Sequence, residues 1–271
     1  GGGTTCSGNP VVPTAGRSLP WTPMRDDATD GWFPESVAAA YDDDPQAVND
    51  PGEIARTVDV LASLAGIGPV LEFAVGTGRI ACPLSERGVA VRGIELSRAM
   101  AARIPAKPGG ELIEVTIGDM CTTRVDGEFT LVYLVYNTIG NVLTQNAQVE
   151  VFANAARHLA PGGRFLVEVG VPDLRRLPPG QDTVPFAVDV ASGYIGFDQY
   201  DVVTQRATSH HVTVEAGDGR LRPFPWRYVW PSELDLMARI AGLELENRWE
   251  DWSRSAFTAE STKHISIWRR P

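Results

Sequence analysis

The sequence is poor in the residue types that metal sites and disulfide frameworks require. It has 3 cysteines and 4 histidines in 271 residues, and no CxxC pair. An odd number of cysteines without such a pair is typical of reduced thiols in a reducing compartment. His210 and His211 are adjacent, and adjacent residues on a strand point to opposite faces, so they do not favour a shared metal ion. We therefore expect no bound metal.

Long apolar runs and basic stripes are missing as well. No run approaches the roughly 18 residues of a membrane helix, and the N-terminus lacks the charged-then-apolar layout of a secretory signal. The net charge is −10, from 34 acidic and 24 basic residues, whereas binding to a phosphate backbone needs clustered positive charge. The composition predicts a cytoplasmic protein that binds neither nucleic acid nor membranes.

What the chain does contain is a regular alternation of apolar strands and amphipathic helices. Strands are predicted at 70–73, 89–95, 112–117, 129–135 and 164–171, with helices between them. This rhythm is typical of a parallel sheet with right-handed crossovers. A helix with Ser232 as its expected cap and two strands near 243–249 and 264–268 close the chain. The fold class predicted is α/β.

The pattern changes between the fifth strand and that last helix. Segments 201–205 and 211–214 alternate with period two around a Gly-Asp-Gly turn, which predicts an antiparallel insertion. The organisation expected is a flexible tail (1–30), an N-terminal lid segment (31–50), a cofactor-binding core (51–172), an antiparallel β insertion that caps the substrate (173–231), and a C-terminal helix and strand hairpin completing the core (232–271).

A glycine turn with flanking carboxylates carries the functional signal. Gly76 and Gly78 follow the strand that contains Glu72, and Glu95 lies 19 residues after Gly76 at the end of the next strand. Glycines let a backbone approach a ligand, and this edge of the sheet is where such folds bind one. A carboxylate at Glu95 can accept both hydroxyls of a ribose.

This pattern also fits the fingerprint of dinucleotide-binding folds, so a dinucleotide and S-adenosylmethionine are both candidate cofactors. Glu72 disfavours an anionic pyrophosphate and suits the cationic amino acid end of S-adenosylmethionine. Asp119 and Met120 follow the third strand, where they can recognise an adenine. The chain also ends in a strand hairpin rather than a second nucleotide-binding half. These features favour S-adenosylmethionine.

At these motifs the chain resembles the class I S-adenosylmethionine-dependent methyltransferases, over roughly residues 50–172 and 232–271. Ala74 stands where the family's first glycine is usual. The resemblance implies a Rossmann-like seven-stranded sheet with an antiparallel last strand, S-adenosylmethionine as cofactor and S-adenosylhomocysteine as product. The cofactor-binding residues it implies are Tyr41, Glu72, Ala74, Gly76, Gly78, Glu95, Leu96, Asp119, Met120, Val135 and Tyr136.

The insertion resembles that of small-molecule enzymes such as sugar N-methyltransferases and glycine N-methyltransferase. The expected reaction is methyl transfer to nitrogen or oxygen of a small molecule, natural products included. Expected substrate contacts are Asn137, Glu168, Arg227 and Tyr228, and catalytic candidates are His210, His211 and Asn141. Glu168 has an alternative role as a structural acid, and the aromatic cluster around Trp226 has one in packing.

Two other functions stay open at this point. One is an NAD(P)-dependent oxidoreductase, which keeps the fold and Glu95 but leaves Glu72 unexplained. The other is a catalytically silent cofactor-binding protein. The sequence also leaves the oligomeric state open, a homodimer included.

Overall fold

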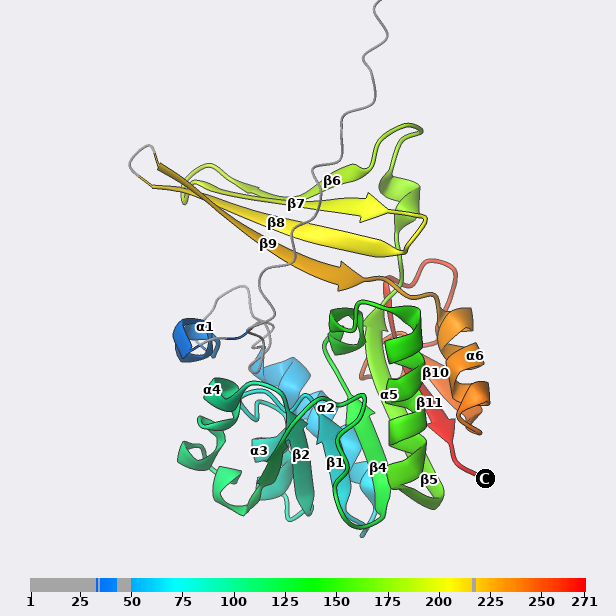
Figure 1. Cartoon of the computed structure of the whole chain (residues 1–271). Helices are drawn as coiled ribbons and strands as arrows, with labels where there is room; N and C mark the ends of the chain where they lie inside the picture. Colours follow the sequence, from blue (N-terminus) through cyan, green and yellow to red (C-terminus); the bar gives the residue numbers. More distant parts are fainter. Residues whose placement is uncertain (1–32, 34, 43–49, 216–217) are drawn as a thin grey trace, which may run out of the picture.

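The computed structural model describes residues 33, 35–42, 50–215 and 218–271. Their strands form a seven-stranded sheet in the order β10-β11-β5-β4-β1-β2-β3 and a four-stranded sheet in the order β6-β7-β8-β9 (Figure 1). The first comprises β1 (Val70–Phe73), β2 (Val91–Glu95), β3 (Glu114–Ile117), β4 (Phe129–Leu134), β5 (Leu159–Gly170), β10 (Glu244–Trp249) and β11 (Lys263–Arg269). The second comprises β6 (Thr183–Asp189), β7 (Tyr194–Asp201), β8 (Arg206–Glu215) and β9 (Asp218–Arg227).

The larger sheet has a parallel centre and an antiparallel end. β1 runs parallel to both β2 and β4, and β5 runs parallel to β4. β11 is antiparallel to β5 and to β10. The prediction of an α/β fold with an antiparallel last strand and a β insertion is confirmed.

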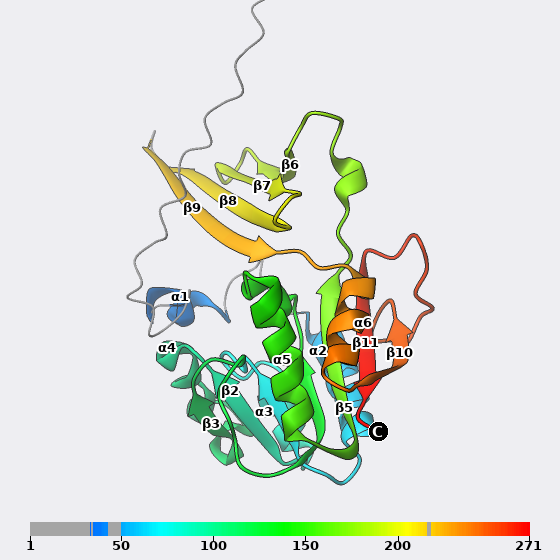
Figure 2. The same cartoon turned by 45° about the vertical axis from the view of Figure 1, so that its right-hand side comes forward.

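Helices cover both faces of this sheet (Figures 1 and 2). Apolar residues of α2 and α3 belong to one buried cluster, and those of α5 and α6 belong to another on the opposite face. The helices are α1 (Glu35–Ala40), α2 (Pro51–Ala65), α3 (Ala81–Glu86), α4 (Arg98–Ala101), α5 (Gln145–His158) and α6 (Pro231–Ile240), with short 3₁₀ turns η1 (Ile104–Ala106), η2 (Gly110–Leu112), η3 (Thr138–Asn141) and η4 (Leu174–Arg176).

Polar caps explain where several helices begin. Ser97 accepts a hydrogen bond from the Met100 amide, as predicted, and Thr144 caps α5 in the same way. The prediction that Ser232 caps the last helix is wrong. Trp230 is the N-cap there and Pro231 occupies the first turn, where a fixed φ and a missing amide cost nothing. The predicted third strand also begins later, because Leu112 belongs to η2.

The four-stranded sheet, here called the cap, lies over the end of the larger sheet at which the parallel strands finish (Figures 1 and 2). The predicted strand at 201–205 is wrong, because β7 ends at Asp201. The Asp201 carboxylate accepts hydrogen bonds from the amides of Val203 and Thr204 and from the Thr204 hydroxyl. Such an Asx turn reverses the chain despite the β-branched residues in it.

The remaining sequence predictions concern the N-terminal segments, the cysteines and membrane helices. The flexible tail at 1–30 and part of the lid segment at 31–50 lie outside the described residues, as does Cys6. Cys82 and Cys121 are buried free thiols. In the ranges that the structure describes, no helix is long and apolar enough to cross a membrane.

Candidate active site

The turn after β1 forms the floor of the site with an unusual backbone. Ala74, Gly76 and Gly78 all have positive φ, at 53°, 59° and 79°. Two features exclude a side chain at Gly78. Its positive φ disfavours residues with a Cβ, and an added Cβ would lie 2.6 Å from the Cys82 sulfur. At Gly76 the absence of a side chain leaves the backbone open to a cavity. Ala74 adopts the same left-handed region without the freedom of glycine, which stores strain at this turn.

Glu95 ends β2 beside this turn. Its carboxylate accepts hydrogen bonds from the Gly76 amide at 2.7 Å and the Ser97 amide at 2.8 Å. Burial raises the pKa of Glu95, while these amides and that of Leu96 lower it. The carboxylate is only 6% exposed, yet it lines the cavity. It is therefore fixed in place with oxygen lone pairs available to a ligand's hydroxyl groups.

Glu72 lies within β1, one layer below the cavity. The Tyr133 hydroxyl donates to its carboxylate at 2.8 Å, and both side chains are buried. Burial raises the pKa of Glu72 to about 8, against the opposing effects of the Tyr133 hydrogen bond and the Arg79 charge. A carboxyl in this setting is readily ionised by a nearby cation, which suits the role expected for it.

The chain after β4 forms a second strained turn. Tyr136 and Asn137 have φ of 61° and 57°. Two groups of β5 hold them: the Glu168 side chain accepts from the Tyr136 amide, and the Gly170 amide donates to the Asn137 side-chain oxygen. Glu168 also accepts from the Trp252 indole at 3.0 Å. Consecutive left-handed residues without glycine persist only where surrounding bonds determine them.

A cavity of about 490 Å³ joins these turns to the cap. That volume is in the range of small-molecule sites. The cap contributes Tyr200, Ser209, Phe224 and Trp226, and the core contributes the turns after β1, β2, β4 and β5. Predicted site residues that line the cavity are Tyr41, Ala74, Gly76, Glu95, Tyr136, Asn137, Asn141, Arg227 and Tyr228.

Other predicted cofactor residues lie around the cavity rather than in its wall. Met120 and Val135 are buried in the two apolar clusters. Asp119 accepts a hydrogen bond from the Cys121 amide, and Leu96 is 37% exposed. Gly78 and Glu72 stand behind the floor, as described above.

Three of the predicted substrate and catalytic residues lie outside the cavity wall. Glu168 is bound to Trp252 and the Tyr136 amide and does not line the cavity, so it supports the wall from behind. His210 stacks on Phe197, on the face of β8 opposite to Ser209. His211 lies on the same face as Ser209 but outside the cavity, bonded to the Tyr194 hydroxyl. Neither histidine lines the cavity.

Arg227 lines the cavity with its charge already neutralised. It is 3% exposed, and its Nη2 donates to Glu233 at 2.6 Å and to Gln205 at 3.2 Å, while its Nη1 donates to Gln148. These bonds fix β9 against α5 and α6 and leave little charge for a substrate.

Several wall residues were not singled out from the sequence as site residues. They are Phe33, Met100, Thr138, Gly140, Val169, Gly170, Val171, Pro172, Asp173, Tyr200, Ser209, Phe224 and Val229, together with Trp226, for which packing was favoured. The available signal was the period-two alternation of the cap strands, which places Phe224 and Trp226 on one face once the register is known.

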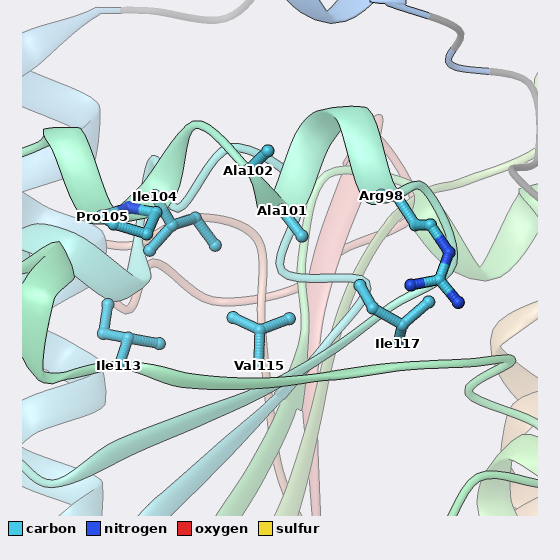
Figure 3. A pocket seen from close by; sticks show the side chains of 8 residues that line it. All are labelled: Arg98, Ala101, Ala102, Ile104, Pro105, Ile113, Val115 and Ile117. Atoms are coloured by element: carbon cyan, nitrogen blue, oxygen red, sulfur yellow. The ribbon is translucent and has the colours of Figure 1, made fainter.

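A second hollow lies apart from this site, between β3 and α4 (Figure 3). Ile113, Val115 and Ile117 point from the strand side toward Ala101, and Arg98 flanks them. None of the motif carboxylates lines it. The chemistry described above belongs to the cavity under the cap.

Comparison with known proteins agrees with this geometry. A family model described as a methyltransferase domain matches residues 70–163. The structure of the CcbJ methyltransferase from Streptomyces caelestis is 33% identical, with a TM-score of 0.76, covering 86% of this chain and 96% of that one. The cypemycin N-terminal methyltransferase of a Streptomyces species is 26% identical over 209 residues, which is 74% of this chain and 82% of the relative.

A more distant structure shares the fold across nearly the whole chain. The sugar N-methyltransferase KedS8 from a Streptoalloteichus species is 17% identical, with a TM-score of 0.61, covering 99% of this chain and 100% of that one. The fold and site thus define a Rossmann-like enzyme that uses S-adenosylmethionine. The chain belongs to the class I S-adenosylmethionine-dependent methyltransferases. The oxidoreductase and the catalytically silent protein are thereby set aside.

Proposed function

We propose that this enzyme methylates a nitrogen atom of a small molecule, with oxygen as the second candidate. The observation that carries the proposal is the cavity itself, which joins the Glu95 turn to an aromatic cap. Among the described residues, no histidine lines it. An oxygen acceptor needs a base, whereas a neutral amine needs little more than alignment and desolvation.

The cofactor supplies a methyl group on a sulfonium, which is an activated leaving-group system. The protein's residues bind and align. Glu95 would hold the ribose hydroxyls, and the Ala74–Gly76 turn would let the amino acid end approach Glu72. Asn137 and Asn141 lie at the end of β4, where their side chains can orient an acceptor. An amine that attacks with its lone pair releases its proton only afterwards, to water.

Phe33 and Tyr41 support the proposed lid at the N-terminal side. Both line the cavity, and their rings meet edge to face with centroids 5.8 Å apart. The adjacent Asp42 accepts from the Thr77 hydroxyl at 2.6 Å and pairs with Lys107. These bonds hold the segment against the glycine turn, where it would exclude water from the reacting atoms.

Several similar proteins are named as nitrogen methyltransferases, which supports a nitrogen acceptor. The similar proteins include a glycopeptide N-methyltransferase and an amino pentose methyltransferase with S-adenosylmethionine bound, besides the proteins above. These support an acceptor from natural-product chemistry.

Two measurements test the proposal. Titration calorimetry with S-adenosylhomocysteine should show about a 100-fold loss of affinity in Glu95→Ala, since two charge-assisted hydrogen bonds disappear. Exposed Glu111 provides the control, and Glu111→Ala should bind normally. Unchanged affinity in Glu95→Ala would contradict the ribose role.

The second measurement is mass spectrometry of methyl transfer to pairs of acceptors that differ only in an amine or a hydroxyl. The amine member should gain the methyl group. Transfer to the hydroxyl members alone would overturn the nitrogen assignment.

A further inference from the structure

Ser209 on β8 is one of the polar residues that the cap contributes to the cavity wall, and its partners fix which hydrogen bonds it can still make. Its hydroxyl donates to Asp198 of β7 at 2.6 Å and accepts from the Trp226 indole at 2.9 Å. A serine hydroxyl has one proton and two lone pairs. The proton and one lone pair are used, so Ser209 can only accept a further bond. It therefore selects a hydrogen-bond donor on the ligand.

The rings beside Ser209 favour a positive charge on that donor. Tyr200 and Trp226 line the cavity with ring centroids 5.9 Å apart and an interplanar angle of 78°. The indole N–H of Trp226 is occupied by Ser209, so the ring offers a ligand its π-face. Burial raises the pKa of Tyr200 to about 12, which keeps its hydroxyl neutral. Aromatic faces attract cations, and desolvation strengthens the attraction.

Asp198 supplies a negative charge directly behind Ser209. Burial raises the pKa of Asp198, and the hydrogen bond from Ser209 and the weaker effects of His211, Arg176 and His210 offset this only in part. Arg176 itself donates to the Pro185 carbonyl. A carboxylate in this setting is stabilised by a cation placed on its hydrogen-bonded neighbour.

We propose that Asp198, Ser209 and the rings of Tyr200 and Trp226 form an anchor for a protonated amine of the acceptor molecule. This anchor is separate from the atom that receives the methyl group, which would react beside Asn137 and Asn141. The inference rests on the proposed function, because it assigns one more group of the same substrate. It selects acceptors that carry a charged N–H donor in addition to the reacting atom.

The test is calorimetry on the full chain saturated with S-adenosylhomocysteine, with benzylammonium and benzyl alcohol as probes. The two share a ring and differ in charge. Benzylammonium should bind about 10-fold more tightly, as a charge-assisted hydrogen bond predicts. Asp198→Asn and Ser209→Ala should each remove that preference and leave S-adenosylhomocysteine binding unchanged.

Asp218→Asn is the matched control, since Asp218 is an exposed acid at the start of β9 in the same sheet. It should keep the preference for benzylammonium. Equal binding of the two probes to the wild type, no detectable binding of either, or the same loss in Asp218→Asn as in Asp198→Asn would overturn the anchor. Thermal unfolding of each variant identifies any that fails to fold, and the wild-type comparison of probes decides the question without them.

The outcome is independent of the methylation assay. If amine acceptors are methylated but the probes bind equally, the anchor fails alone. If no amine is methylated while benzylammonium is preferred, the proposed reaction fails and the anchor remains.

Discussion

The cofactor wall of the cavity is built from backbone turns, whereas the cap wall is built from side chains on strands. Ala74 and Gly76 present main chain to the cavity, and Glu95 is locked by two amides. The cap presents Ser209 and Trp226 from an antiparallel ladder. A turn fixes its geometry through φ and ψ, while a strand side chain can be exchanged without changing the register. The first suits a constant ligand and the second a ligand that varies between enzymes.

The buried carboxyl of Glu72 should give the stability of the cofactor wall a large pH dependence between about pH 4.5 and pH 8. Its pKa is about 8 in the folded chain against an ordinary 4.5, so between these values the folded state keeps a proton that the unfolded state has lost. Its contribution to stability is complete below about pH 4.5 and is lost as the pH rises through about 8. The difference corresponds to at most about 5 kcal/mol.

Glu72→Gln should remove this loss, because glutamine can still accept from the Tyr133 hydroxyl. Thermal unfolding between about pH 5 and pH 9 should show that the stability of the variant, relative to the wild type, increases as the pH rises. Glu95 and Glu168 also have raised pKa values, but they are present in both proteins and cancel in the comparison. Glu111→Gln, at an exposed site, should run parallel to the wild type. Parallel curves for Glu72→Gln would refute the assignment.

Glu168→Ala should have the next largest effect on stability, because it leaves two buried donors without an acceptor. The Trp252 indole and the Tyr136 amide both lose their partner, at about 3 kcal/mol of unfolding free energy. The left-handed turn at Tyr136 and Asn137 then loosens, and methyl transfer should fall with stability. Urea unfolding measures the first effect and turnover the second.

Glu246→Ala is the control for Glu168→Ala, because it also removes a carboxylate but at a more exposed position. Glu246 pairs with Arg164 at 2.6 Å near the surface, where such pairs contribute about 1 kcal/mol or less. A Glu168→Ala variant as stable as Glu246→Ala would show that β5 does not hold the strained turn.

The cofactor wall could be predicted from the sequence because the residues that indicate it lie close together along the chain. Glycines at 76 and 78 and an acid after the next strand are read from neighbouring residues, and the parallel fold brings them to one edge. The left-handed pair Tyr136–Asn137 gave no such signal, because neither is glycine and bonds from β5 impose the conformation.

The cap could be predicted only in outline, for a related reason. Which side chains face the cavity depends on register, and register depends on where each hairpin turns. Val202 and Val203 favour a strand by propensity, yet the Asp201 carboxylate ends β7 there. Predicting a strand at 201–205 hides the hairpin, and with it the ladder that pairs Tyr200 with Ala207 and Ser209 with Asp198.

The same Gly→Ala change in each sheet should separate the rigid wall from the adaptable one. At Gly93 in β2 an added Cβ would lie 2.6 Å from Val75, which is buried behind the cofactor turn. Overpacking there should cost about 2 kcal/mol and weaken S-adenosylhomocysteine binding, since Val75 adjoins Gly76.

At Gly196 in β7 the added Cβ would meet the Phe186 ring, which is 43% exposed and free to turn outward. Gly196→Ala should therefore cost about 1 kcal/mol or less and leave cofactor binding unchanged. Chemical unfolding and calorimetry of the two variants make the comparison. Equal costs would mean that the cap is packed as rigidly as the core.

The smallest effect expected is a gain in stability from Ala74→Gly. The left-handed φ of 53° at Ala74 costs a residue with a Cβ about 1–2 kcal/mol, and glycine avoids it at an entropic cost of about 0.5–1 kcal/mol. The net gain is about 0.5–1 kcal/mol. Ala55→Gly, at an exposed position inside α2, should instead lose about 1 kcal/mol. One substitution with opposite signs at two sites isolates backbone strain from the loss of a methyl group, and equal losses at both would show that the cofactor turn stores none.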